Sequence, residues 1–258
     1  MKSDFEVIVK KLPKADVRIY PVSDLHVGDA GFNEDAFIQF VNHVQESSDE
    51  YVILAGDLMN NAIRTSVSNV FAETMRPSEQ KRWIAERLEP IRDKILCAVP
   101  GNHERRSLKD ADDEPLYDIM CKLDLEDIYR PNMAFLEIEL GDTHAQYRIG
   151  VTHGSSGASK TGGAVNRNEA FGHIIEGLDA LITGHTHKGA ITRPQKMVVN
   201  PVTKRVEMRD FVVMTTVAWN GHSDYAIQKQ LNPASSQLPC LYLKANASHK
   251  AKSLGVVW

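Results

Sequence analysis

Eight polar residues with metal-binding side chains lie at or just after the ends of short apolar runs. They are Asp24, His26, Asp57, Asn102, His103, His153, His185 and His187. All of them offer nitrogen or oxygen atoms, and none offers a thiolate. The set therefore suits a divalent ion such as Mn, Fe, Zn or Ni and argues against a soft-metal or cluster site.

The number of donors indicates how many ions the site would hold. One tetrahedral ion needs three or four protein ligands. Seven donors, with His103 set aside, are too many for one ion and indicate two. A pair of ions about 3.5–4 Å apart needs a bridging carboxylate, and Asp57, alone at the end of its apolar run, is the natural bridge.

The apolar runs that precede these residues are predicted to be buried strands, because each is short and bounded by Gly, Pro or Asp. They span residues 17–22, 51–54, 95–99, 147–151 and 181–182. Ligands of α/β sheets bind outside the carboxyl ends of the strands. We therefore expect the eight polar residues to meet at one rim of a sheet.

Helical periodicity separates the predicted strands. Helices are expected over residues 33–45, 78–92, 113–123 and 166–178, the first with Asn33 as N-cap. The alternation predicts a layered α/β protein with crossover helices. Two strand-like runs, 191–199 and 205–217, predict an antiparallel hairpin and hence a mixed or second sheet.

We expect residues 1–258 to form a single domain, with 226–258 as a C-terminal extension. Leu241 to Leu243 reads as a short strand, and the sequence does not decide whether the last stretch is an ordered strand or a frayed tail.

Composition excludes several classes of protein. The chain has 258 residues, 42% hydrophobic and 25% charged, which excludes a disordered or low-complexity protein. The net charge of −4 argues against a surface that binds nucleic acid electrostatically as a whole. Three scattered cysteines predict no disulfide framework. No apolar run could span a membrane and no signal peptide is recognisable, so we expect a cytoplasmic protein without a membrane partner. The oligomeric state is open.

The motifs that carry these residues resemble, in their order, those of the calcineurin-like metallophosphoesterases. They read Asp24-x-His26, Gly56-Asp57, Gly101-Asn102-His103-Glu104, a lone His153, and Gly184-His185-x-His187. The resemblance implies the α/β fold of that family, a four-layer metallophosphoesterase fold. In it, two mixed β-sheets pack as a sandwich with flanking helices.

The resemblance also implies a role for each residue. Asp24, His26, Asp57 and His187 would hold the first metal, and Asp57, Asn102, His153 and His185 the second. His103 would face the leaving group rather than bind metal. A hydroxide bridging two divalent ions, Mn first among them, would then attack a phosphate ester.

Candidate substrate contacts are less specific. Asn60 stands where many family members have Asp or His; it carries no charge, which leaves the orientation of His103 less certain than the metal site. Arg105 and Arg106 follow the motif, and one of them could bind phosphate, with Arg105 as the candidate. His222, after a predicted strand, is a further candidate contact. A solvated role suits each arginine equally well.

The expected function is a metal-dependent phosphoesterase, with a phosphodiester of nucleic acid or nucleotide type slightly preferred. The alternatives are a phosphomonoesterase or protein phosphatase, or a non-catalytic scaffold that keeps the fold.

Overall fold

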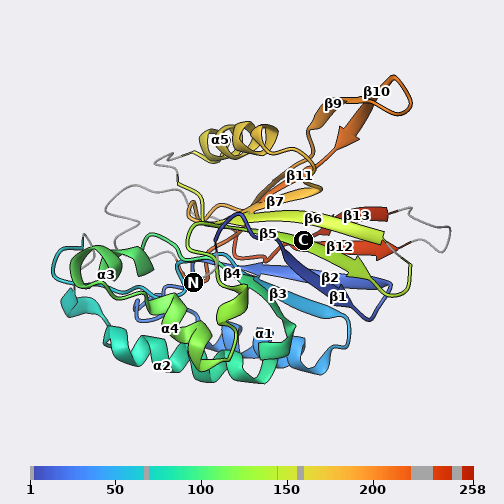
Figure 1. The fold of residues 1–258 in the computed structure, drawn as a ribbon. Helices are drawn as coiled ribbons and strands as arrows, with labels where there is room; N and C mark the ends of the chain where they lie inside the picture. The colour runs from blue at the N-terminus through green and yellow to red at the C-terminus, as the bar shows by residue number, and fades with distance from the viewer. Residues whose placement is uncertain (1–2, 67–69, 144, 156–159, 222–234, 246–251) are drawn as a thin grey trace.

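The computed structural model describes residues 3–66, 70–143, 145–155, 160–221, 235–245 and 252–258. Two sheets pack face to face within this part of the chain (Figure 1). His222 and most of the segment 222–251 lie outside the described residues, so the expected substrate contact at His222 stays a prediction.

The five-stranded sheet has the order β13-β12-β2-β3-β4. Its strands are β2 (Asp16–Val22), β3 (Glu50–Leu54), β4 (Ile95–Ala98), β12 (Cys240–Ala245) and β13 (Lys252–Val257). β2, β3 and β4 run parallel, whereas β12 is antiparallel to both β2 and β13. Every residue of β3 and β4 is buried, as expected for parallel strands covered on both faces.

The six-stranded sheet has the order β1-β5-β6-β7-β11-β8. Its strands are β1 (Ile8–Leu12), β5 (Met133–Leu140), β6 (Ala145–Thr152), β7 (Ala180–Thr183), β8 (Ala190–Thr192) and β11 (Val212–Thr215). This sheet is also mixed, since β6, β7 and β11 are parallel while β5 and β8 are antiparallel to their neighbours β6 and β11. Every second residue of β5 is buried, so one face of this strand turns to the core.

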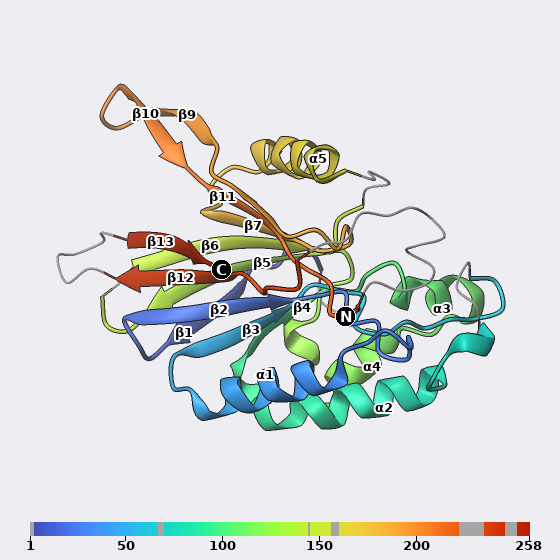
Figure 2. The ribbon, with the colours of Figure 1, turned by 180° about the vertical axis from the view of Figure 1, so that it is seen from behind.

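Helices cover the outer faces of both sheets, and Figures 1 and 2 show four layers. The helices are α1 (Glu34–Glu46), α2 (Pro77–Leu88), α3 (Glu104–Ala111), α4 (Pro115–Lys122) and α5 (Thr161–Ile174). α1, α2 and α4 lie outside the five-stranded sheet, and α5 lies outside the six-stranded one. The prediction of an α/β fold with two mixed sheets and flanking helices is confirmed.

The first predicted helix has the expected local chemistry. The side chain of Asn33 accepts a hydrogen bond from the Ala36 N–H (3.1 Å), as an N-cap should. Phe37, Val41 and Val44 form the buried stripe. The predicted helix 78–92 is α2 followed by a 3₁₀ segment, Glu89–Lys94, which begins just before Pro90.

The bounds of one predicted helix need correction, and one helix was not predicted. α5 begins at Thr161 and ends at Ile174, earlier than the predicted 166–178; Gly162 and Gly163 disfavour a helix but here lie in its first turn. α3 was not predicted, because it carries no apolar stripe. Its buried residues are Glu104 and Ser107.

The predicted hairpin is only partly correct. β9 (Gln195–Asn200) and β10 (Arg205–Asp210) pair antiparallel and project from the body in both views (Figures 1 and 2). The outer ends of the two predicted runs instead form β8 and β11, which join the six-stranded sheet. Each predicted run is thus divided between the projecting β9–β10 hairpin and the six-stranded sheet.

The expected strand at Leu241 to Leu243 is confirmed as part of β12, and β13 follows it as an ordered last strand. Among the described residues, no helix combines the length and the apolar character needed to cross a bilayer.

Candidate metal centre

The predicted donors come from the carboxyl ends of strands in both sheets. β2, β3 and β4 of the five-stranded sheet lead to residues 24–26, 57 and 102–103, while β6 and β7 of the six-stranded sheet lead to residues 153 and 185–187. The structure brings all eight residues together at one end of the sandwich. The site therefore lies where the two sheets meet.

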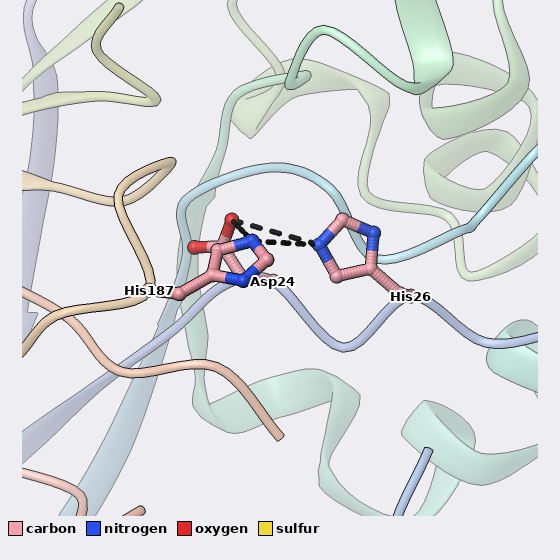
Figure 3. Close-up of side chains that lie close together, drawn as sticks. All are labelled: Asp24, His26 and His187. Carbon is pink, nitrogen blue, oxygen red and sulfur yellow. Dashed lines mark hydrogen bonds and ion pairs between the residues drawn. The ribbon is translucent and has the colours of Figure 1, made fainter. Parts of the chain in front are cut away.

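Asp24, His26 and His187 form the first donor group (Figure 3). The Nε2 atoms of the two histidines are 3.0 Å apart, and His187 Nε2 lies 3.3 Å from Asp24 Oδ1. Asp24 is fully buried, and its Oδ1 atom has no hydrogen-bond partner. A buried carboxylate oxygen without a donor is costly unless a cation binds it.

Asp57, His153 and His185 form the second donor group, with Asn102 beside it. His153 Nε2 lies 3.1 Å from Asp57 Oδ2 and 3.2 Å from Asn102 Oδ1. The same Asn102 oxygen is 2.7 Å from His185 Nδ1. Four potential ligand atoms thus lie within reach of one ion.

Asp57 lies between the two groups. Its carboxylate, His26 and His103 also offer atoms that are all within 4.8 Å of one another. The backbone N–H of His103 donates to Asp57 Oδ1 (2.8 Å). This position agrees with the expected bridging role, which stays a prediction.

Hydrogen bonds to the ligand residues orient them for metal binding. His153 Nδ1 lies 2.8 Å from the Ala55 carbonyl oxygen, so this nitrogen carries a proton and Nε2 is the atom that faces Asp57 and Asn102. Asp24 Oδ2 accepts from the His185 N–H (3.0 Å) and from Ser23 Oγ, which in turn contacts Thr216 Oγ1. These contacts turn Oδ1 of Asp24 into the site. Such oriented nitrogen and oxygen donors fit a divalent cation.

The backbone at the site is strained. Five predicted ligands have positive φ: Asp24 (53°), His26 (51°), Asp57 (52°), His185 (72°) and His187 (57°). L-residues adopt this left-handed conformation rarely, and such strain concentrates at functional sites. The turns after the strands are therefore set by the ligand geometry more than by local preference.

Two motif glycines permit the close approach of these turns. A Cβ on Gly56 (φ +87°) would lie 2.5 Å from the Gly101 nitrogen, and one on Gly184 would lie 2.8 Å from Asp24 Oδ2. No side chain fits at either position without moving a ligand loop.

The pKa values of the two carboxylates favour the binding of cations. Burial raises the pKa of Asp24, but the adjacent imidazole of His187 outweighs it and lowers the value to about 2. Burial likewise opposes ionisation of Asp57, yet His153 brings its pKa far below the ordinary range. The pKa of His153 rises to about 10 because the charge of Asp57 exceeds the effect of burial, and burial keeps the pKa of His26 well below its usual value. Both carboxylates therefore remain charged.

Glu104 holds two of the motif loops together. Its buried carboxylate accepts four backbone N–H groups: Oε1 from Leu58 (2.7 Å) and Met59 (3.1 Å), and Oε2 from Asp57 (3.0 Å) and Gly101 (2.8 Å). From the sequence alone, Glu104 is named only as the last residue of its motif. An acidic residue in the first turn of α3 was the available signal.

His103 is oriented by a main-chain group. Its Nδ1 lies 2.8 Å from the Asn60 carbonyl oxygen, and its Nε2 lies 3.8 Å from Asp57 Oδ2. The Asn60 side chain instead donates to Glu73. The orientation of His103, which the sequence left uncertain, is therefore set by a main-chain carbonyl that any residue at position 60 would have, and the substrate contact expected at Asn60 stays a prediction. Burial lowers the pKa of His103.

The side chains of the two candidate arginines point in different directions. Arg105 Nη2 donates to the Pro131 carbonyl (2.9 Å), whereas Arg106 Nη2 lies 2.9 Å from His103 Nε2. The structure thus places Arg106, rather than the chosen Arg105, beside the proposed leaving-group residue.

Comparison with known proteins gives the family. The model of the calcineurin-like phosphoesterases matches residues 17–189. The chain therefore belongs to the calcineurin-like phosphoesterase family, and it is a metal-dependent hydrolase of phosphate esters. A search of curated proteins found no match.

Several solved structures are similar to this chain. Vps29 of Entamoeba histolytica complexed with zinc shares 13% identity at a TM-score of 0.38, over 93% of this chain and 98% of that one. A metallophosphoesterase of Sphaerobacter thermophilus shares 14% identity at a TM-score of 0.40, over 94% of this chain and 89% of that one. A predicted phosphoesterase of Streptococcus pneumoniae shares 13% identity at a TM-score of 0.37, over 94% of this chain and 99% of that one.

Proposed function

We propose that this protein hydrolyses phosphodiesters with a pair of divalent metal ions. The observation that carries the proposal is the two facing donor groups, Asp24–His26–His187 and Asp57–His153–His185, with Asp57 near both. Neither group uses a thiolate, so we propose Mn²⁺ first, with Fe, Zn or Ni as alternatives.

Each ion would have its own ligand set. Asp24, His26, Asp57 and His187 would hold the first ion, and Asp57, Asn102, His153 and His185 the second. When bound, two such ions polarise the phosphoryl oxygen and activate water for in-line attack. The chain's own residues then have to place the ester and assist the leaving group.

His103 is suited to the leaving-group side. Its Nδ1–H donates to Asn60 and its Nε2 accepts from Arg106, so Nε2 is the atom that would take up a proton before passing it to the departing oxygen. General acid assistance of this kind typically contributes about 10²–10⁴-fold to the rate. The effect is largest for poor leaving groups such as nucleosides.

The preferred substrate is a nucleotide or nucleic-acid diester, because an alkoxide leaving group needs the proton that His103 offers. We further propose a cytoplasmic protein, since the three scattered cysteines are typical of a reducing compartment. Residues 1–258 would act as one domain, in which the C-terminal extension contributes β12 beside β2.

The experiment compares bis-p-nitrophenyl phosphate with p-nitrophenyl phosphate on protein first stripped with EDTA and then given Mn²⁺, Fe²⁺, Zn²⁺ or Ni²⁺. We expect turnover only with added metal and a higher kcat/KM for the diester. A higher value for the monoester would reverse the substrate preference, and no bound metal with no turnover would reject the function.

A variant pair separates the enzyme from a scaffold. Asp57→Asn should abolish metal binding and turnover, whereas Asp142→Asn, a fully exposed carboxylate, should leave both unchanged. A phosphomonoesterase or protein phosphatase would share the Asp57 result but prefer the monoester or a phosphopeptide. A scaffold would show no turnover in either form.

A further inference from the structure

Arg105 and Arg106 are neighbours on α3 with different surroundings. Arg105 is exposed, and its guanidinium is held by the Pro131 carbonyl. Arg106 is half-buried, and its guanidinium reaches back along the helix to His103. The pair therefore offers a charge inside the site and a matched charge outside it, one residue apart.

Two contacts fix the position of Arg106. Nη1 donates to the Asn60 carbonyl (3.0 Å), and Nη2 donates to His103 Nε2 (2.9 Å). The Asn60 carbonyl also accepts from His103 Nδ1. One backbone oxygen thus holds both side chains, so the guanidinium and the imidazole lie side by side.

This position borders the metal centre. The His103 ring packs against that of His26, with centroids 4.4 Å apart, and His103 Nε2 lies 3.8 Å from Asp57 Oδ2. The Arg106 guanidinium carries several N–H donors in one plane, and Nη2, which contacts His103, lies on the side of the metal centre. Its planar fork matches the oxygens of a phosphate.

We propose that Arg106 binds a non-bridging phosphate oxygen of the substrate on the His103 side of the centre. This inference rests on the proposed phosphoesterase function. A phosphate oxygen is a stronger acceptor for a guanidinium than a neutral imidazole nitrogen is. Arg106 therefore transfers a hydrogen bond from His103 Nε2 to the substrate, and Nε2 becomes available to face the leaving oxygen.

The test measures binding of inorganic phosphate to the Mn²⁺-loaded protein by calorimetry, which requires no turnover. Arg106→Gln should weaken phosphate binding by about ten- to a hundredfold, the usual worth of hydrogen bonds to a charged group. Arg105→Gln, the matched control, should stay within about twofold of wild type, as expected for an exposed side chain. Bound Mn²⁺ is measured on each variant.

Equal phosphate affinities for Arg106→Gln and Arg105→Gln would overturn the proposal, as would loss of Mn²⁺ from Arg106→Gln, since either result makes Arg106 a structural residue. If Arg106→Gln does not fold, Arg106→Lys is compared with Arg105→Lys. Lysine keeps the charge but lacks the fork, so the first should bind phosphate several-fold more weakly than the second, and equality again overturns the proposal.

Kinetics distinguish this proposal from the proposed function. With bis-p-nitrophenyl phosphate, Arg106→Gln should raise KM more than it lowers kcat, because p-nitrophenolate hardly needs a proton. Failure of the wild type to hydrolyse any ester would reject the phosphoesterase proposal, while the calorimetric comparison would still decide whether Arg106 binds phosphate. A lower kcat with unchanged KM and unchanged phosphate affinity would contradict the assignment of Arg106.

Discussion

The two sheets contribute different chemistry to the same centre. The five-stranded sheet supplies both carboxylates and the amide, through Asp24, Asp57 and Asn102, together with His26 and His103. The six-stranded sheet supplies imidazoles alone, from residues 153, 185 and 187. Neither sheet by itself offers a complete ligand set, so negative charge comes from one side and neutral donors from the other.

An ion bound at this centre would therefore join the two sheets. Asp24 and His187 face each other from β2 and β7, and Asp57 and His153 do so from β3 and β6. An ion held by either pair would connect the two halves of the sandwich more tightly than their apolar contact alone.

The largest expected effect is on metal affinity, which should fall further when a carboxylate is removed from an ion than when an imidazole is removed from the same ion. Asp24→Asn removes a full charge about 4 Å or less from the cation, worth about 4 kcal/mol or a thousandfold in affinity near a protein surface. His187→Asn removes a neutral donor and should cost less. Both positions have positive φ, which Asn tolerates. Mn²⁺ titration gives the two affinities, and equal losses would contradict the division of charge between the sheets.

Metal removal should loosen both sheets together. Mn²⁺ at a hundred times its Kd stabilises the folded state by about 2.7 kcal/mol, which for a chain of this size raises Tm by roughly 5–10 °C. Chelation should therefore lower Tm by that amount. It should also speed hydrogen exchange in β3 and β7 alike. Faster exchange confined to one sheet would show that the metal belongs to that sheet alone.

Glu104→Gln tests the support beneath Asp57. The amide nitrogen of Gln would face backbone N–H donors, leaving at least one of them unsatisfied, at a cost of about 1–3 kcal/mol. The urea midpoint should fall accordingly. Glu137→Gln, on the partly exposed strand β5, is the control and should change stability by less than about 0.5 kcal/mol. Equal midpoints would mean that the four N–H contacts add nothing.

The smallest effect should come from Thr216, the outer of the two hydroxyls behind Asp24. Ser23→Ala removes a donor to Asp24 Oδ2, and such supporting contacts typically change metal affinity by about 10–100-fold. Thr216→Val acts one hydrogen bond further away and should have a weaker effect. The affinity of the protein for the first ion should fall, while its affinity for the second ion stays unchanged. A loss shared by both ions would instead indicate a general structural defect.

The meeting of the eight polar residues at one end of the sandwich could be predicted because the signal was local. A buried strand followed by Asp, Asn or His is recognisable from a few residues, and parallel strands bring such ends to one rim. The helices with apolar stripes, such as α1, were predictable for the same reason. α3 was not, because its buried side chains are polar and its placement depends on Glu104 reaching the distant loop at residues 57–59.

Contacts that depend on tertiary structure could not be predicted. Nothing in the sequence distinguishes Arg105 from Arg106, since only the packing of α3 against residue 60 directs one of them to His103. The orientation of His103 by a main-chain carbonyl is invisible to an argument about side chains. The two runs predicted as a hairpin are divided between the β9–β10 hairpin and the six-stranded sheet, and this division likewise depends on which strands are neighbours in that sheet.

The left-handed backbone at five ligand positions implies a trade-off between folding and activity. Glycine has no Cβ and adopts positive φ without the steric cost that Asp and His bear there. Glycine at such a position should therefore remove a ligand while the stability of the metal-free protein is kept or raised. A change that stabilises the metal-free fold at these positions would thus remove part of the metal centre.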